Sequence, residues 1–312
     1  MRIVFCGTPE FAVPSLRRLA AEPGISVEAV ITQPDRPRGR GQQLGSSPVK
    51  EAALAANLHV YQPETIKSDS AQEFLKRVAP DAVVIIAYGQ IIPARLLTIP
   101  RLGWINLHAS LLPRYRGAAP IHWAIANGET ITGLTTMQID AGMDTGPILL
   151  RRELEIGPEE TSPELAERMR EIGASLIVES IQRFDRGEIS PAPQDPSKAS
   201  YAPILKRENG RIEWTHTSQQ IYDRMRGFTP WPGTFASFRG QTCHLWGHPE
   251  GTAPLERNTT PGEIISSAKE IHVACGEGTF LRLESVQLEG RKRISAREFA
   301  NGARLAPGDK FA

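Results

Sequence analysis

Residues 81–87 read DAVVIIA, an apolar run that lacks the polar alternation of a half-exposed strand. Such a run is typical of a parallel strand covered by helices on both faces of its sheet. RIVFC at residues 2–6 has the same character, and VEAVI follows at residues 27–31. Amphipathic stretches at residues 11–21 and 47–57 separate these runs. The order predicts an α/β fold in which a doubly wound, mostly parallel sheet forms the first domain.

The rest of the chain divides at a proline-rich segment. TGLTTMQI indicates a further strand, and the amphipathic stretch at residues 163–184 predicts the helix that closes the first domain. Residues 188–206 hold four prolines and little periodicity, as in an extended linker. Short strand-like runs follow it and predict a small β-barrel. We therefore expect a catalytic domain at residues 1–189, a linker at 190–206 and a smaller domain at 207–312.

Composition limits the possible classes of protein. The chain has 312 residues, 40% of them hydrophobic and 23% charged, which favours two ordinary globular domains. No apolar run is long enough to span a bilayer, and the N-terminus lacks the pattern of a secretory signal, so we expect a cytoplasmic protein without membrane contact. The three cysteines are far apart, which argues against a disulfide framework and a clustered zinc site. Net charge is only +1, so any contact with nucleic acid must come from local clusters.

The first strand is followed by CGTPEF, where a dinucleotide-binding protein would carry the pattern G-x-G-x-x-G. That pattern places glycines against a pyrophosphate, and here only Gly7 is present. Gly7 is more simply interpreted as a turn residue and Pro9 as the start of a helix. We therefore do not expect NAD as a cofactor.

The segment GWINLHASLLPRYRGAAPIHW carries the main catalytic candidates. Asn106 and His108 lie at the end of a predicted strand, residues 104–108, and two-residue alternation puts both side chains on one face. Ligands of open α/β sheets bind beyond the carboxyl ends of the strands, which favours a catalytic role. A structural interpretation, with Asn106 ending the strand and His108 as a satisfied buried histidine, is equally compatible with the spacing.

A third candidate lies in the glycine-rich loop IDAGMDTGP. A carboxylate beside an imidazole orients the ring and stabilises its protonated form. Asp140 and Asp144 both lie in this loop, and spacing does not distinguish between them.

Several segments resemble the methionyl-tRNA formyltransferase family, and they occur in the family's order over nearly the whole chain. They are FCGTPEFAVPSL, QPDRPRGRGQ, AYGQIIP, INLHASLLPRYRGAAPI, GLTTMQIDAGMDTGPIL and FTPWPG. The resemblance implies a Rossmann-like first domain and an OB-like, open-barrel second domain. It also places the family's catalytic Asn, His and Asp on Asn106, His108 and Asp144.

The same resemblance implies the substrates. The co-substrate would be 10-formyltetrahydrofolate, with no requirement for a metal ion or a covalent nucleophile. Two segments would form the walls of the folate site, SLLP and the start of AYGQIIP; their residues are Ser110, Leu111, Leu112, Pro113, Ala87, Tyr88 and Gly89. Without the resemblance, ordinary packing at the ends of strands is the better explanation of both segments.

The acceptor would be initiator methionyl-tRNA, bound by a monomeric enzyme. The family's tRNA-contacting loop corresponds to a segment with three arginines, Arg36, Arg38 and Arg40. A second basic cluster, Arg291, Lys292 and Arg293, lies in the barrel domain. Each cluster is also compatible with a solvated loop.

Two other functions remain open at this point. One is a folate-dependent formyltransferase acting on a small amine, such as an amino-sugar nucleotide or a ribonucleotide, because such enzymes share the Asn, His and Asp set. The other is a non-catalytic tRNA-binding protein built on the same fold, against which the intact set of three residues argues.

Overall fold

The computed structural model describes residues 1–38, 43–252, 259–266 and 270–312. The chain divides into two compact units, which we describe separately. Unit 1 comprises Met1–Pro120, Ile131–Glu155 and Glu164–Pro203, and unit 2 comprises Ile121–Thr130, Ile156–Pro163 and Ile204–Ala312.

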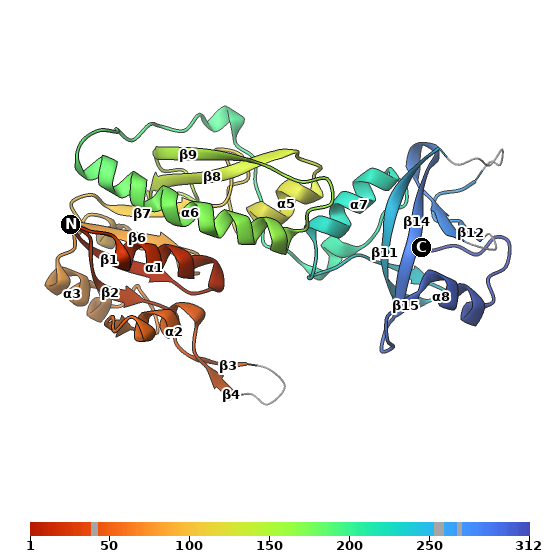
Figure 1. Ribbon diagram of the computed structural model, residues 1–312, viewed down its shortest axis with the longest axis horizontal. Coiled ribbons are helices and arrows are strands. Elements are labelled where there is room, and N and C mark those ends of the chain that lie inside the picture. Colours follow the sequence, from red (N-terminus) through yellow and green to blue (C-terminus); the bar gives the residue numbers. More distant parts are fainter. Residues whose placement is uncertain (39–42, 253–258, 267–269) are drawn as a thin grey trace. The chain divides into compact units, whose positions relative to one another are not determined.

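Unit 1 is built on a seven-stranded sheet with the order β5-β2-β1-β6-β7-β8-β9 (Figure 1). Strands β5, β2, β1, β6 and β7 are parallel, and β8 and β9 extend the sheet in antiparallel fashion. The strands are β1 (Arg2–Gly7), β2 (Ser26–Ile31), β5 (Val60–Tyr61), β6 (Ala82–Ile86), β7 (Trp104–His108), β8 (Ile131–Gln138) and β9 (Ile148–Glu155). A separate two-stranded hairpin consists of β3 (Arg36–Arg38) and β4 (Gln43–Gly45).

Helices cover both faces of this sheet. They are α1 (Val13–Ala21), α2 (Pro48–Ala55), α3 (Asp69–Val78), α4 (Ala94–Leu97) and α6 (Ser162–Asp185). On one face, side chains of α3 and α4 pack with Cys6, Ile85 and Trp104 in a single buried cluster. On the other, Ser180 of α6 hydrogen bonds to Thr136 of β8. The central strands β1, β6 and β7 are buried on both faces, which explains their unbroken apolar runs.

The register of β7 decides where Asn106 and His108 lie. Asn106 pairs with Ile85 of β6 and Met137 of β8, and His108 pairs with Thr135. Paired residues project from the same face of a sheet, so Asn106 and His108 share the face that α3 and α4 cover. His108 is the last residue of β7, and Asn106 is the middle residue of the strand.

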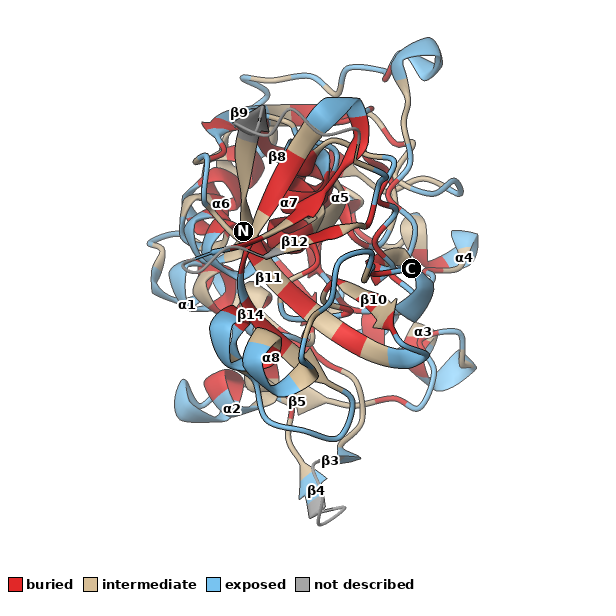
Figure 2. Ribbon diagram, turned by 90° about the vertical axis from the view of Figure 1, so that its right-hand side faces the viewer, coloured by how far each residue is buried: buried red, intermediate tan, exposed pale blue. Residues whose placement is uncertain are grey.

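Unit 2 contains an antiparallel sheet with the order β10-β11-β14-β13-β12, and β15 pairs with β14. The strands are β10 (Phe235–Phe238), β11 (Gln241–Thr252), β12 (Ile264–Ser266), β13 (Ile271–Ala274), β14 (Thr279–Leu288) and β15 (Ile294–Ser295). Its helices are α5 (Pro120–Ala126), which begins one residue before the unit, α7 (Ser218–Gly227) and α8 (Ala296–Ala303). Figure 2 shows buried and half-buried residues alternating along β11, as expected of a strand with one face on the core.

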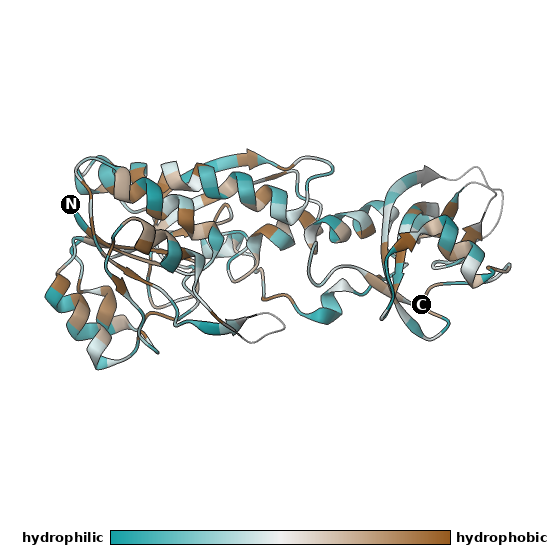
Figure 3. Ribbon diagram, turned by 60° about the horizontal axis from the view of Figure 1, so that its bottom comes forward, coloured by the Kyte–Doolittle hydropathy of each residue, from teal (hydrophilic) through white to brown (hydrophobic). Residues whose placement is uncertain are grey.

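Hydrophilic and hydrophobic residues are mixed along the helices (Figure 3), which is the pattern of helices with one face on a core. Short 3-10 turns complete the structure at Glu10–Ala12, Pro196–Lys198, Arg207–Gly210 and Gly276–Gly278. The predicted fold class is confirmed: a Rossmann-like, mostly parallel sheet is followed by an antiparallel sheet that curls into part of a barrel. No helix was predicted from the sequence at α3, α4, α5 or α8.

Candidate active site

The loop after β7 folds back over the end of its own strand. Oγ1 of Thr135, on the neighbouring strand β8, donates to the carbonyl of Ser110 at 2.6 Å and accepts from the N–H of Leu112 at 3.1 Å. The Ser110 hydroxyl donates to the carbonyl of Arg114 at 2.6 Å. These bonds turn the chain so that the carbonyl oxygen of Tyr115 reaches Nε2 of His108 at 2.9 Å.

The ring of His108 is thereby fixed in one tautomer. A carbonyl oxygen can only accept, so Nε2 of His108 carries the proton in its bond to Tyr115. Nδ1 faces the carboxylate of Asp144, and the distance to Oδ2 is 3.7 Å. That distance is too long for a hydrogen bond, so Nδ1 is close to a negative charge without being tied to it. A proton on Nδ1 would therefore be available to a third group.

Asp144 is held in place by the loop after β7. Its Oδ2 accepts a hydrogen bond from the backbone N–H of Gly117 at 2.8 Å. The backbone of Asp144 has φ of +52°, a left-handed conformation that costs energy for a residue with a side chain. Gly117 has φ of +116°, and a Cβ atom there would lie 2.7 Å from the carbonyl oxygen of Ala202. This close approach requires glycine.

The structure gives different surroundings to Asp140 and Asp144, the two acidic residues between which spacing could not choose. Oδ1 of Asp140 accepts from the N–H of Gly142 at 3.0 Å and from Oγ1 of Thr145 at 2.7 Å, all within the same loop. Asp140 therefore stabilises the loop, while Asp144 faces the histidine.

Asn106 is half-buried, on the same sheet face as His108. Within the described part of the chain, its side-chain amide has no hydrogen-bond partner. A half-buried amide in this position can donate to a ligand at the end of β7.

The residues predicted for the folate site differ in their exposure. Ala87 and Gly89 are exposed and both have positive φ, +47° and +87°. The ring of Tyr88 lies in the core instead, and its carbonyl accepts from Thr8 Oγ1 and Gln33 Nε2. Burial raises the pKa of the Tyr88 hydroxyl. Strands β6 and β7 are parallel, so the segments that follow them lie at one edge of the sheet.

Among the SLLP residues, only Leu111 is more than slightly exposed. Ser110, Leu112 and Pro113 are buried, and Leu112 packs with Met137 and Ile148. The Ser110 hydroxyl is engaged by the loop itself. These residues shape the loop around His108, and Leu111 is the one with apolar surface to offer a ligand.

The predicted tRNA loop is the β3–β4 hairpin. Arg36 is exposed on β3, and Arg38 lies at the end of that strand. Arg40 lies outside the described residues. The base of the hairpin is held by Asp35, whose carboxylate meets Nζ of Lys50 at 2.5 Å and accepts from Nε2 of Gln62 at 2.9 Å.

In unit 2, Arg291, Lys292 and Arg293 are all exposed. Arg293 is also ordered: its Nε donates to Oγ of Ser285 at 2.6 Å, and its guanidinium lies 3.9 Å from the ring centre of Trp246. Trp246 was not predicted from the sequence as a functional residue. Its position on β11 opposite Ser285 of β14 follows only from strand register.

Two further residues near the site were not predicted from the sequence. Arg116 is buried in the loop after β7, and Gln194 is buried in the segment predicted as a linker. Nε and Nη2 of Arg116 donate to Oε1 of Gln194 at 3.2 and 2.7 Å. Arg116 could have been predicted, because it is an arginine in the loop that follows the candidate histidine. No pattern in the sequence pointed to Gln194.

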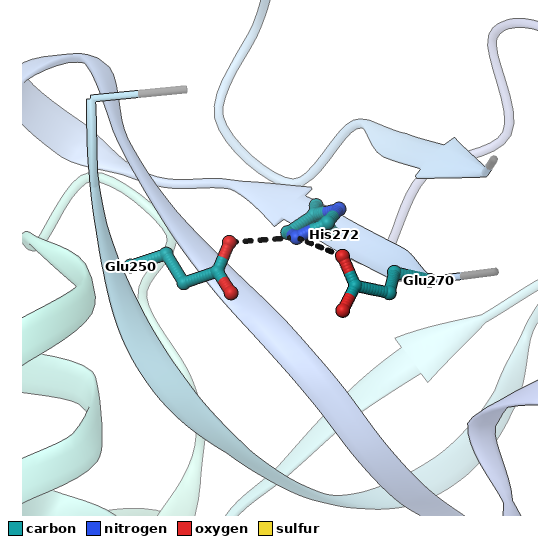
Figure 4. A group of neighbouring side chains, drawn as sticks. All are labelled: Glu250, Glu270 and His272. Atoms are coloured by element: carbon teal, nitrogen blue, oxygen red, sulfur yellow. Dashed lines mark hydrogen bonds and ion pairs between the residues drawn. The ribbon is translucent and has the colours of Figure 1, made fainter. Parts of the chain in front are cut away.

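Unit 2 also contains a cluster of possible metal-binding groups, Glu250, Glu270 and His272 (Figure 4). Nε2 of His272 lies 2.8 Å from Oε2 of Glu250 and 3.9 Å from Oε2 of Glu270. Nε of Arg282 lies 3.1 Å from the other Glu250 oxygen. Because Arg282 and His272 already pair with Glu250, the cluster is explained as an ion-pair network.

In the described part of the chain, no helix has the length and apolar character needed to cross a membrane.

Comparison with known proteins places the chain in a family. The family model "Formyl transferase" matches residues 1–181, and the model of its C-terminal domain matches residues 204–304. A methionyl-tRNA formyltransferase of Solibacter usitatus is 52% identical over 311 residues, covering 100% of this chain and 98% of the relative. One of Koribacter versatilis is 51% identical over 314 residues, covering 100% and 98%.

Solved structures share the fold at lower identity. An N-formyltransferase from Helicobacter canadensis, in complex with folinic acid and dTDP-3-aminofucose, has a TM-score of 0.65 at 19% identity, covering 90% of this chain and 98% of that one. HypX from Aquifex aeolicus, in complex with tetrahydrofolic acid, has a TM-score of 0.60 at 16% identity, covering 100% of this chain and 50% of that one. At this identity the likeness concerns the fold alone. Because its relatives match along the whole chain at about half identity, this protein belongs to the methionyl-tRNA formyltransferase family.

Proposed function

We propose that this protein transfers the formyl group of 10-formyltetrahydrofolate to the free amino group of methionyl initiator tRNA, for translation initiation. The observation that carries the proposal is the pairing of His108 with Asp144 at the end of β7, with Asn106 on the same sheet face. The names of the relatives support the choice of acceptor.

Formyl transfer requires stabilisation of an oxyanion. The amine attacks the formyl carbon, and the carbonyl oxygen gains negative charge in the tetrahedral intermediate. Asn106 donates to that oxygen through its side-chain amide. In its doubly protonated form, beside the Asp144 carboxylate, His108 donates through Nδ1, because Nε2 already donates to Tyr115. One such donor typically contributes about 100- to 1000-fold in rate.

The intermediate then collapses with a proton transfer. The bond from the formyl carbon to the folate nitrogen breaks, and that nitrogen gains a proton while the attacking amine loses one. Asp144 is the group placed to relay it, directly or through a water molecule, because among the described residues its carboxylate accepts a single hydrogen bond, from the N–H of Gly117. The reaction needs neither a metal ion nor a covalent intermediate.

The folate is proposed to lie at the edge of the sheet beyond β6 and β7. The exposed backbone at Ala87 and Gly89 can meet the polar edge of the pterin, with Leu111 as an apolar wall. Tyr88, Ser110, Leu112 and Pro113 support these segments from within the core.

The tRNA is proposed to contact two basic regions. Arg36 and Arg38 of the β3–β4 hairpin meet the acceptor end, as does Arg40, which lies outside the described residues. Arg291, Lys292 and Arg293 meet the phosphate backbone elsewhere. Arg293 is supported by its geometry, because stacking on Trp246 and the bond to Ser285 hold its planar donors in one orientation. In this proposal residues 1–189 perform catalysis and supply the first basic region, and residues 207–312 supply the second.

Because charged initiator tRNA is made and used in the cytoplasm, we propose that the protein works there, as a monomer. Light scattering coupled to size-exclusion chromatography tests the oligomeric state, with and without tRNA. A stable dimer in both conditions would contradict this part of the proposal.

The acceptor is tested by incubating the purified protein with 10-formyltetrahydrofolate and charged initiator methionyl-tRNA. Elongator methionyl-tRNA, free methionine and a dTDP-linked amino sugar serve as controls. We expect formylation of the initiator tRNA alone. Formylation of the amino sugar would favour the small-amine alternative, and formylation of none would indicate a non-catalytic protein.

A further inference from the structure

The segment predicted as a linker holds both loops of the active site. We refer to residues 192–202 as the strap. Ala192 exchanges two backbone hydrogen bonds with Ile148, just after the Asp144 loop, at 2.7 and 2.8 Å. Ser200 accepts from the N–H of Arg116 at 2.8 Å and, through its hydroxyl, from the N–H of Tyr115 at 2.9 Å. The strap therefore contacts the loop that fixes His108 and the loop that carries Asp144.

One buried side chain in the strap connects the two loops directly. Oε1 of Gln194 accepts two hydrogen bonds from Arg116, and its Nε2 donates to the carbonyls of Asp144 and Gly146, both at 2.8 Å. Arg116 immediately precedes Gly117, whose N–H binds the Asp144 carboxylate. Gln194 thus binds the backbone of Asp144 and also binds Arg116. Arg116 is the neighbour of Gly117, whose N–H holds the Asp144 side chain.

The chemistry of this position selects an amide. Arginine only donates and a carbonyl only accepts, so the side chain between them needs an acceptor on one side and donors on the other. A carboxylate would pair with Arg116 and leave two carbonyl oxygens facing negative charge. An apolar side chain would leave the buried Arg116 without its partner, which is costly.

We propose that Gln194 is a positioning residue that sets the place of the Asp144 carboxylate relative to His108. Asp144 has a left-handed backbone that must be held by its surroundings, and Gln194 binds the carbonyls of residues 144 and 146, on either side of Thr145. The inference rests on the proposed formyl transfer, because that reaction is what the carboxylate serves.

The first test compares three single variants of the full chain. Gln194→Met keeps the volume and removes every hydrogen bond of the amide, and Gln194→Glu keeps only the contact with Arg116. Ser180→Ala is the control, because it removes a buried hydrogen bond to Thr136 on the opposite face of the sheet. We expect kcat to fall about 10- to 100-fold in both Gln194 variants, as for a misplaced catalytic group, with KM for folate and tRNA nearly unchanged. Ser180→Ala should keep the kcat of the wild type.

The second test separates positioning from general loosening. In an Asp144→Asn background, Gln194→Met should cost much less kcat than it does alone, because the group it positions has already lost its charge. Amide hydrogen exchange at Gly117 should also be faster in Gln194→Met than in the wild type, a readout that needs no activity.

Three results would overturn the inference: an unchanged kcat in Gln194→Met, an equal loss in Ser180→Ala, or a full additional loss in the Asp144→Asn background. A wild-type protein that formylates no methionyl-tRNA would instead refute the proposed function. Exchange at Gly117 would still decide whether Gln194 holds Asp144.

Discussion

Oδ2 of Asp144 lies 3.7 Å from Nδ1 of His108, near enough for electrostatic attraction and too far for a direct hydrogen bond. The opposite nitrogen of His108 is committed to the Tyr115 carbonyl, and Asp144 is held by Gly117. The pair is thus oriented by the backbone of one loop.

His108→Ala removes the proposed oxyanion donor. We expect kcat for formyl transfer to fall by at least about 100-fold, with a similar fall in kcat/KM, since the lost interaction belongs to the transition state. Steady-state formylation of initiator methionyl-tRNA measures both constants. His59→Ala, which changes an exposed histidine before β5, is the control and should behave like the wild type. Wild-type turnover by His108→Ala would rule out the assignment.

Asp144→Asn and Asp140→Asn distinguish the two acidic residues of the same loop. Asp144→Asn retains an acceptor for Gly117 and loses the charge and the proton relay, so kcat should fall about 100-fold or more. Asp140→Asn retains an acceptor for the bonds of its own loop, and its effect on kcat should stay within about threefold. Single-turnover assays at saturating substrate make the comparison. A larger loss in Asp140→Asn would reverse the assignment.

Arg36→Ala tests the hairpin arm. Loss of one phosphate contact should raise KM for tRNA about three- to tenfold, leave KM for folate unchanged, and reduce the slope of log KM against log salt by about one. Arg186→Ala removes the same charge from an arginine that pairs with Glu188 and should change neither. An identical salt dependence in Arg36→Ala and the wild type would exclude this contact.

Arg293→Lys tests whether geometry, beyond charge, matters in unit 2. Lysine keeps the charge but cannot reproduce the planar stack on Trp246 together with the bond to Ser285. We expect tRNA affinity, measured by filter binding, to fall about three- to tenfold in Arg293→Lys and no less in Arg293→Ala. Arg297→Ala, in α8, is the control. Wild-type affinity in Arg293→Ala would remove this residue from the proposed surface.

The three cysteines should be unreactive in the folded protein. Burial raises the pKa of the Cys243 and Cys275 thiols to about 12 and that of Cys6 further still. A raised pKa keeps the thiol neutral at pH 8, and the thiolate is the form that reacts. Ellman's reagent should therefore label all three only after addition of denaturant. Rapid labelling of a folded thiol, with loss of activity, would reopen a covalent role for cysteine.

The sequence by itself determined the sheet and the face on which the candidates lie. Apolar runs such as residues 81–87 are typical of strands that are covered by helices on both faces of a sheet. Two-residue alternation puts the side chains of Asn106 and His108 on one face of any strand that contains both. Resemblance to a family then supplied Asp144, which spacing could not separate from Asp140. The prediction of the sheet and the prediction of Asp144 both depended on short sequence patterns that can be recognised along the chain.

Only the tertiary structure decided how these groups are held. The bond of His108 to Tyr115, the Gly117 N–H on Asp144 and the stack of Arg293 on Trp246 join residues through loop closure and strand register, and no local periodicity specifies either. Gln194 is the clearest case. A proline-rich segment has the composition of a linker, but its one buried amide satisfies donors and acceptors on two loops that the folded chain brings together.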